Sequence, residues 1–135
     1  MNSKEILKAN KIRPTKARVF LLNLLANAEK PLDATSLLSL IRKRRLGIDR
    51  ATLFRTIQIF LKKELIRKLE FGDGKYHYEV SALPHHHHLV CNNCGQIKDV
   101  VMNDVQILEK EIEKKAQFHI NHHHLEFFGL CRNCH

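Results

Sequence analysis

The first half of the chain has hydrophobic residues at helical spacing in four successive segments. Each segment begins at a side chain that can accept a hydrogen bond from the first turn of a helix, and the expected caps are Ser3, Thr15, Asp33 and Asp49. Pro31 ends the second segment, and a basic run at residues 42–45 followed by Gly47 ends the third. The pattern therefore predicts three or four short helices within residues 1–62.

The fourth predicted helix has two distinct faces. Its apolar residues are Leu53, Ile57, Phe60 and Leu61, and its opposite face carries Ala51, Arg55, Gln58 and Lys62. Residues 65–71 and 75–80 then alternate around Gly72-Asp73-Gly74, which predicts a β-hairpin with a tight glycine turn. This order of elements predicts a winged helix-turn-helix whose fourth helix enters the major groove of DNA. The alternative is a helical domain whose basic face is merely solvated.

The second half mixes short strands with one helix. Residues 89–91, 97–101 and about 120–130 are expected to be strands. A capping box of Asn103 and Gln106 predicts the start of a helix that buries Val105, Leu108, Ile112 and Ala116. The fold class is therefore α+β, with an N-terminal domain in residues 1–80, a hinge in 81–84 and a small α/β domain in 85–135.

Charge divides the chain in the same way. Residues 1–80 carry 18 Lys and Arg against 8 Asp and Glu, a net charge of +10, whereas residues 81–135 carry 5 against 6. Nine of the ten histidines and all four cysteines lie in the second part. The first part is suited to a polyanion and the second to metals.

The composition also bears on the compartment. No apolar run approaches the roughly 20 residues that cross a membrane, and the N-terminus lacks a signal-peptide core. We therefore expect a cytoplasmic protein with no membrane partner. Thiols stay reduced in that compartment, so four cysteines in two close pairs favour a metal over disulfides.

The cysteines form two pairs, Cys91-x-x-Cys94 and Cys131-x-x-Cys134, which 36 residues separate. A two-residue spacer lets a tight turn direct both thiolates at one ion, and two such pairs complete the tetrahedron that zinc prefers. The binding free energy of such an ion contributes to the folding of a small domain. We expect one structural zinc ion. A redox disulfide pair or unrelated cysteines are the alternatives.

Four consecutive histidines, residues 85–88, adjoin the first cysteine pair; because the run is internal, it is not an affinity tag. In an extended strand His86 and His88 share one face while His85 and His87 share the other. Glu79 and Asp99 could join His86 and His88 in a site of nitrogen and oxygen ligands, which suits iron(II), manganese, zinc or nickel.

A second histidine run supplies candidates for a site on the other face of the strand, and its members are His122, His123 and His124. The three remaining histidines have no comparable partners in the sequence. These residues, His77, His119 and His135, are expected at the surface.

Several motifs together resemble the ferric uptake regulator family. They are the histidine run joined to Cys91-x-x-Cys94-Gly95, the later Cys131-x-x-Cys134, Thr15-x-x-Arg18, and Ala51-Thr52-Leu53-Phe54-Arg55. The resemblance covers almost the whole chain. It implies a homodimeric, metal-dependent transcriptional repressor that binds a double-stranded DNA operator and no small-molecule substrate, with an N-terminal winged helix and a C-terminal dimerisation domain.

The resemblance also implies roles for individual residues. The structural zinc falls on Cys91, Cys94, Cys131 and Cys134. The regulatory metal falls on Glu79, His86, His88 and Asp99, the set that strand alternation also brings together. An additional metal site falls on His85, His87 and His123. The DNA contacts fall on Thr15, Lys16, Arg18, Thr52, Phe54 and Arg55.

The sequence departs from the family's pattern in several places. Lys30-Pro31 stand where many members have a histidine that completes the regulatory site, and four remaining ligands fit zinc somewhat better than six-coordinate iron. Gln106, with Glu109 one turn further on, stands at the helix carboxylate of the additional site. Phe54 replaces a tyrosine and keeps the apolar contact to a thymine methyl group.

We therefore predict a repressor in which the regulatory metal, iron(II) or zinc with manganese or nickel also suited, fixes the angle between the domains, with Glu79 as the bridging ligand. The alternative from another class is a zinc-ribbon, metal-dependent enzyme acting on nucleic acid. Against it, the basic residues and the histidines lie in different domains, so a nucleic-acid substrate would not meet the metal. A histidine-rich metal store is a third possibility.

Overall fold

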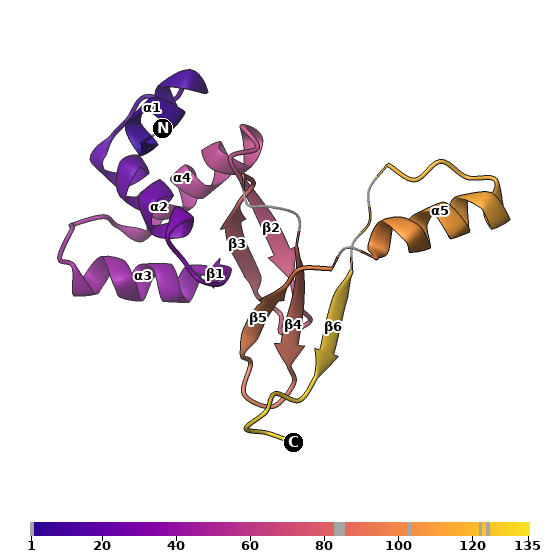
Figure 1. The fold of residues 1–135 in the computed structure, drawn as a ribbon. Coiled ribbons are helices and arrows are strands. Elements are labelled where there is room, and N and C mark those ends of the chain that lie inside the picture. The colour runs from indigo at the N-terminus through magenta and orange to yellow at the C-terminus, as the bar shows by residue number, and fades with distance from the viewer. Residues whose placement is uncertain (1, 83–85, 103, 122, 124) are drawn as a thin grey trace. The chain divides into compact units, whose positions relative to one another are not determined.

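The computed structural model describes residues 2–82, 86–102, 104–121, 123 and 125–135 (Figure 1). The chain divides into two compact units, Met1–Leu83 and Pro84–His135. Both units combine helix with sheet, so the α+β class is confirmed. Among the described residues, no helix is long and apolar enough to span a membrane.

The first unit is a winged helix, as the sequence predicts. Its elements in chain order are α1 (Ser3–Ala9), α2 (Lys16–Ala26), β1 (Leu32–Asp33), α3 (Ala34–Lys43), α4 (Arg50–Lys62), β2 (Ile66–Glu70) and β3 (Tyr76–Val80). The three strands form an antiparallel sheet in the order β1-β3-β2. The predicted hairpin is the β2-β3 pair.

Three of the four predicted helix caps are confirmed. The side chains of Thr15, Asp33 and Asp49 accept hydrogen bonds from backbone amides at the starts of α2, α3 and α4. The prediction for the first helix is wrong by one residue. Asn2 caps α1 and forms a reciprocal capping box with Glu5, while the Ser3 hydroxyl donates instead to the side chain of Asn23 in α2.

The hydrophobic core of the first unit lies between its helices. The largest fully buried side chains are Leu7, Leu21, Leu25, Leu37, Leu53, Ile57 and Phe60. The inward face of α4 is the predicted one, and the opposite face, Ala51, Arg55, Gln58 and Lys62, is exposed. Core packing therefore fixes which side of α4 is presented to solvent.

His77 is not the surface residue that the sequence predicts. Its side chain is buried in β3, and its Nε2 lies 2.9 Å from the Asp73 carboxylate at the hairpin turn. This hydrogen bond lowers the pKa of Asp73. Nearby, Lys75 Nζ lies 3.6 Å from the carboxylate of Asp33, the cap of α3. The turn of the hairpin is thus tied to both β3 and α3.

The second unit has a three-stranded sheet and one helix. Its elements are β4 (His87–Cys91), β5 (Ile97–Val100), α5 (Val105–Ala116) and β6 (Glu126–Gly129). The strand order is β5-β4-β6, with β4 antiparallel to β5 and parallel to β6. The last strand is shorter than predicted, because pairing with β4 begins only at Glu126.

The prediction for α5 is wrong in two respects. Asp104 is its N-cap and makes no side-chain capping hydrogen bond, while the expected cap, Asn103, lies outside the described residues. Of the four residues expected to be buried, Val105 is buried, but Leu108 is 49% exposed and Ile112 45% exposed, and Ala116 is also exposed. The amphipathic pattern is present, yet the rest of the unit does not cover the apolar face.

Asp33→Ala should destabilise the first unit by about 1 kcal/mol at neutral pH, because the amide of Ser36 loses its acceptor. Burial raises the pKa of Asp33, but hydrogen bonds from Ser36 and the charge of Lys75 outweigh burial, so the pKa lies below its ordinary value. The carboxylate therefore stabilises the fold above that ordinary value, and this contribution is lost as pH falls through the folded-state pKa.

Urea unfolding followed by far-ultraviolet circular dichroism measures this effect. Ser39→Ala, on the exposed side of the same helix, is the control and should change stability by less than about 0.5 kcal/mol. An Asp33→Ala deficit that is the same at neutral and strongly acidic pH would contradict the proposed ionic cap.

Candidate metal centres

The four cysteines gather at one end of the second unit's sheet. Cys91 is the last residue of β4, and Cys131 follows β6 closely. Because β4 and β6 are parallel and Cys91 is paired with Gly129, the two cysteine pairs leave the sheet side by side. All four thiols are free, and their Sγ atoms lie within 4.8 Å of one another.

The sulfur atoms crowd one another in a way that favours a bound cation. Hydrogen bonds from the amides of Cys94 and Cys131 lower the pKa of Cys91 to about 6. At Cys94 the amide of Gln96 lowers the pKa, but the neighbouring thiols outweigh it and raise the value to about 11. One thiolate forms readily, and further ionisation needs a positive charge at the centre.

The spacing of the cluster fits zinc. A zinc–sulfur distance of about 2.3 Å in a tetrahedron separates the sulfurs by about 3.8 Å. Cys94 Sγ and Cys131 Sγ are 3.6 Å apart. In addition, Asn93 Nδ2 donates to Cys134 Sγ at 3.3 Å, which helps to orient that ligand. These four side chains could hold a zinc ion with no open coordination position.

His86, which precedes β4, His88 of β4 and Asp99 of β5 form a second cluster. His88 is paired with Asp99 across the two strands. Its Nε2 lies 3.5 Å from one carboxylate oxygen of Asp99, and His86 Nε2 lies 3.9 Å from the other. The two imidazole rings have centroids 4.8 Å apart. The sequence predicts that these three residues share a metal site, and in the second unit their side chains do lie close to one another.

Glu79, the fourth predicted ligand of this cluster, belongs to the first unit. It lies in β3 and forms an ion pair of 2.9 Å with Arg67 of β2, the residue it opposes in the hairpin. Its role as a metal ligand stays a prediction.

His87 points to a different group of residues. Its ring centroid lies 5.0 Å from that of His123, and its Nδ1 is 3.2 Å from the carbonyl oxygen of Leu125. Nδ1 of His123 contacts the Glu109 carboxylate of α5. Two of the three predicted ligands of the additional site therefore meet beside a carboxylate, while His85 lies outside the described residues. Glu109, one turn after Gln106 in α5, supplies that carboxylate.

The residues predicted to contact DNA lie on two helices of the first unit. Thr15 caps α2, which carries Lys16 and Arg18, and α4 carries Thr52, Phe54 and Arg55. Lys16 and Arg55 are exposed. The sequence does not single out Arg50, but the structure places it beside one of these residues. Its guanidinium carbon lies 5.7 Å from the centroid of the Phe54 ring. The i, i+4 spacing of the two residues was the available signal.

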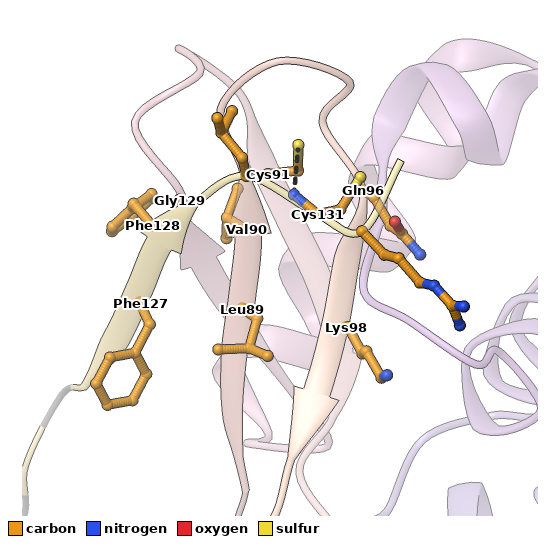
Figure 2. A pocket seen from close by; sticks show the side chains of 11 residues that line it. Leu89, Val90, Cys91, Gln96, Lys98, Phe127, Phe128, Gly129 and Cys131 are labelled. Carbon is orange, nitrogen blue, oxygen red and sulfur yellow. Dashed lines mark hydrogen bonds between the residues drawn. The ribbon is translucent and has the colours of Figure 1, made fainter. Parts of the chain in front are cut away.

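The sheet of the second unit also carries an open, largely apolar groove of about 370 Å³. Figure 2 shows Leu89 and Phe127 on neighbouring strands, with Phe128 nearer the cysteine cluster. Phe128 is 51% exposed and Leu130 is 55% exposed. Large apolar side chains left in solvent around a groove are typical of an interaction surface.

Comparison with known proteins agrees with these features. A model of the Ferric uptake regulator family matches residues 9–128. The ferric uptake regulation protein of Bacillus subtilis is 33% identical over 114 residues, covering 82% of this chain and 76% of the relative. The peroxide operon regulator of the same organism is 26% identical over 130 residues, covering 96% of this chain and 89% of the relative.

A solved structure of the Vibrio cholerae ferric uptake regulator superposes with a TM-score of 0.84 at 26% identity. The match covers 96% of this chain and all of that chain. That structure is described as showing a structural rearrangement of the DNA-binding domains.

Cys131→Ala should abolish tight zinc binding and loosen the second unit, because removing one thiolate opens the tetrahedron and the binding energy contributes to folding. Metal content of the purified protein is measured by mass spectrometry, and loosening by amide hydrogen exchange in residues 86–102. Asn92→Ala changes an exposed residue of the Cys91–Cys94 turn, beside the same cluster, and should keep the full zinc content. A Cys131→Ala protein that retains stoichiometric zinc would show that the cluster is not the binding site.

Proposed function

The chain belongs to the ferric uptake regulator family, a family of metal-responsive transcription regulators, and we propose that it is a repressor that binds an operator in double-stranded DNA as a homodimer. The observation that carries this proposal is the division of chemistry between the units. One unit is a basic winged helix, and the other gathers histidine, carboxylate and thiol groups. A regulator needs both, a DNA reader and a metal sensor.

We assign DNA binding to residues 1–80, a hinge to residues 81–84, and metal binding and dimerisation to residues 85–135. The exposed face of α4 supports the first assignment, because Arg55, Gln58 and Lys62 lie on it and the helix contains no carboxylate. The proposed DNA contacts are Thr15, Lys16, Arg18, Thr52, Phe54 and Arg55. Phosphate contacts from this unit would make binding strongly dependent on salt.

The metals have different tasks in this proposal. Zinc bound by the four cysteines would stabilise the second unit permanently. A tetrahedral site with four thiolate ligands leaves no coordination position open for another ligand. The regulatory metal would be held by Glu79, His86, His88 and Asp99. Imidazole and carboxylate ligands suit zinc and iron(II), as well as manganese or nickel. His85, His87 and His123, with Glu109 beside them, would hold a further ion.

Glu79 is the ligand that makes the metal a switch. A metal changes a conformational equilibrium only as far as its affinity differs between the two conformations, so at least one ligand must come from the other unit. Glu79 precedes His86 by seven positions, and an extended chain of that length spans at most about 25 Å. It can therefore reach the histidine cluster within the limits of the hinge. The domain rearrangement described for the Vibrio cholerae relative supports a movable DNA-binding domain.

The exposed apolar residues of the second unit support a homodimer. Besides the groove residues, α5 and its surroundings expose Ile107, Leu108, Ile112 and Phe118. A second copy of the chain would remove this surface from water and set the spacing of two α4 helices on successive major grooves.

Family membership argues against the enzyme that cleaves nucleic acid, because members of this family are transcription regulators. We place this regulator in the cytoplasm, where its DNA and reduced thiols are found.

Glu79→Ala should weaken metal-dependent operator binding while leaving the cysteine-bound zinc in place. We expect the half-effective concentration of the regulatory metal to rise by about tenfold or more, since loss of a ligand or its supporting shell costs affinity of that order. Fluorescence anisotropy of a labelled operator, titrated separately with iron(II), manganese, zinc and nickel, measures it.

Two further variants sharpen the Glu79 experiment. Glu79→Gln keeps a partner for Arg67 but weakens metal binding, so it separates loss of the ligand from loss of the ion pair. Glu70→Ala, an exposed carboxylate of β2, is the control. Metal dependence that is unchanged in both Glu79 variants would contradict the proposal that Glu79 is a metal ligand bridging the units.

Leu108→Glu should convert the dimer to monomers, because a charge at the partly exposed apolar face of α5 would be buried without a partner in the dimer. Lys110→Glu, an exposed position of the same helix, should leave the dimer intact. Sedimentation velocity at several protein concentrations distinguishes the two states. An unchanged dimer in the Leu108→Glu variant would exclude this face from the interface.

A further inference from the structure

Arg50 and Phe54 form a stacked pair at the beginning of α4. Arg50 is the first residue of the helix, and Phe54 lies one turn later on the same side. The guanidinium carbon is 5.7 Å from the centre of the phenyl ring, within the range of a cation–π contact. Arg50 is exposed and Phe54 is half-buried, so the ring holds the guanidinium at the surface of the helix.

The neighbouring acidic group does not compete for this arginine. The Asp49 carboxylate accepts the amide of Thr52 at 2.8 Å and serves as the cap of α4. The charge that lowers the pKa of Asp49, after these hydrogen bonds from Thr52, is that of Arg55. The donors on the edge of the Arg50 guanidinium are therefore directed by the phenyl ring rather than by a carboxylate.

We propose that Arg50 reads a guanine in each operator half-site and that Phe54 holds it in position for that contact. This inference rests on the proposed function, in which α4 lies in the major groove. Residues near the N-terminus of such a helix contact base edges, and an arginine fork matches the O6 and N7 acceptors of guanine. Phe54 is therefore a positioning residue for Arg50, in addition to its own apolar contact with a thymine methyl group.

Stacking favours a base contact over a phosphate contact for a physical reason. A free arginine side chain loses rotamer freedom when it is fixed, and a stacked one has lost part of that freedom before binding. Phosphate contacts do not require this preorganisation. Other cations of the unit can supply them, because the run Arg42-Lys43-Arg44-Arg45 before α4 is exposed.

Selection from a pool of randomised DNA by the metal-loaded, full-length protein tests the proposal. The wild-type protein should select sites with a guanine at one fixed position in each half-site. Arg50→Ala should reduce the preference for that guanine by about 10- to 100-fold and leave the other positions unchanged. Phe54→Leu, which keeps an apolar side chain but removes the ring, should reduce the same preference by a smaller factor.

Lys63→Ala is the matched control, because Lys63 is an exposed cation at the C-cap of the same helix. It should leave the guanine preference unchanged. If Arg50→Ala instead weakens binding to all sequences equally and lowers the salt slope of binding by about one, Arg50 contacts phosphate and the inference is overturned. If the wild-type protein selects no sequence with any metal, the proposed function fails and the inference fails with it. Selection by the wild-type protein that Arg50→Ala does not change overturns the inference alone.

Discussion

The parallel pairing of β4 with β6 is the interaction on which the second unit depends. It joins residues about 38 positions apart, and it sets Cys91 opposite Gly129 and His88 opposite Glu126. The cysteine pairs meet at one end of these strands, and His87 meets the Leu125 carbonyl at the other. One short ladder of hydrogen bonds therefore positions both the cysteine cluster and His87. A displacement of β6 along β4 would separate the thiols and remove His123 from His87 at the same time.

This unit has little else to hold it together. Among its described hydrophobic residues, Cys91 and Val105 are buried, while the large side chains of α5 and β6 are substantially exposed. Apolar burial within one chain is therefore a minor source of its stability. The first unit is different, because its helices enclose a continuous apolar core. The first unit is therefore stabilised by its own core, whereas the second leaves much of its apolar surface exposed.

The features that the sequence predicted correctly are those set by side chains close to one another along the chain. The caps Thr15, Asp33 and Asp49 and the two faces of α4 follow from side chains within a few positions of one another, and all were confirmed. His77 was assigned to the surface because no local rule marks Asp73, across the hairpin turn, as its partner. The α5 pattern predicts that Leu108 and Ile112 are buried, but not that the rest of the unit leaves them exposed. The pairing of β4 with β6 could not be predicted from the sequence either, because it joins strands that lie far apart along the chain.

Register is the link between the cysteine cluster and the histidines. Neighbouring side chains of a strand point to opposite faces, so a slip of β4 by one residue would exchange His86 and His88 with His87. The first pair would then face the residues beside α5, and His87 would face Asp99, leaving neither group with its proper ligands. Cys91 ends the same strand, and its sulfur accepts the amides of Cys94 and Cys131. Once a metal fixes that sulfur, the strand cannot slip, and the histidines that precede it are held on their correct faces. The cysteine cluster and the cluster of His86, His88 and Asp99 therefore depend on one strand register, although they share no residue.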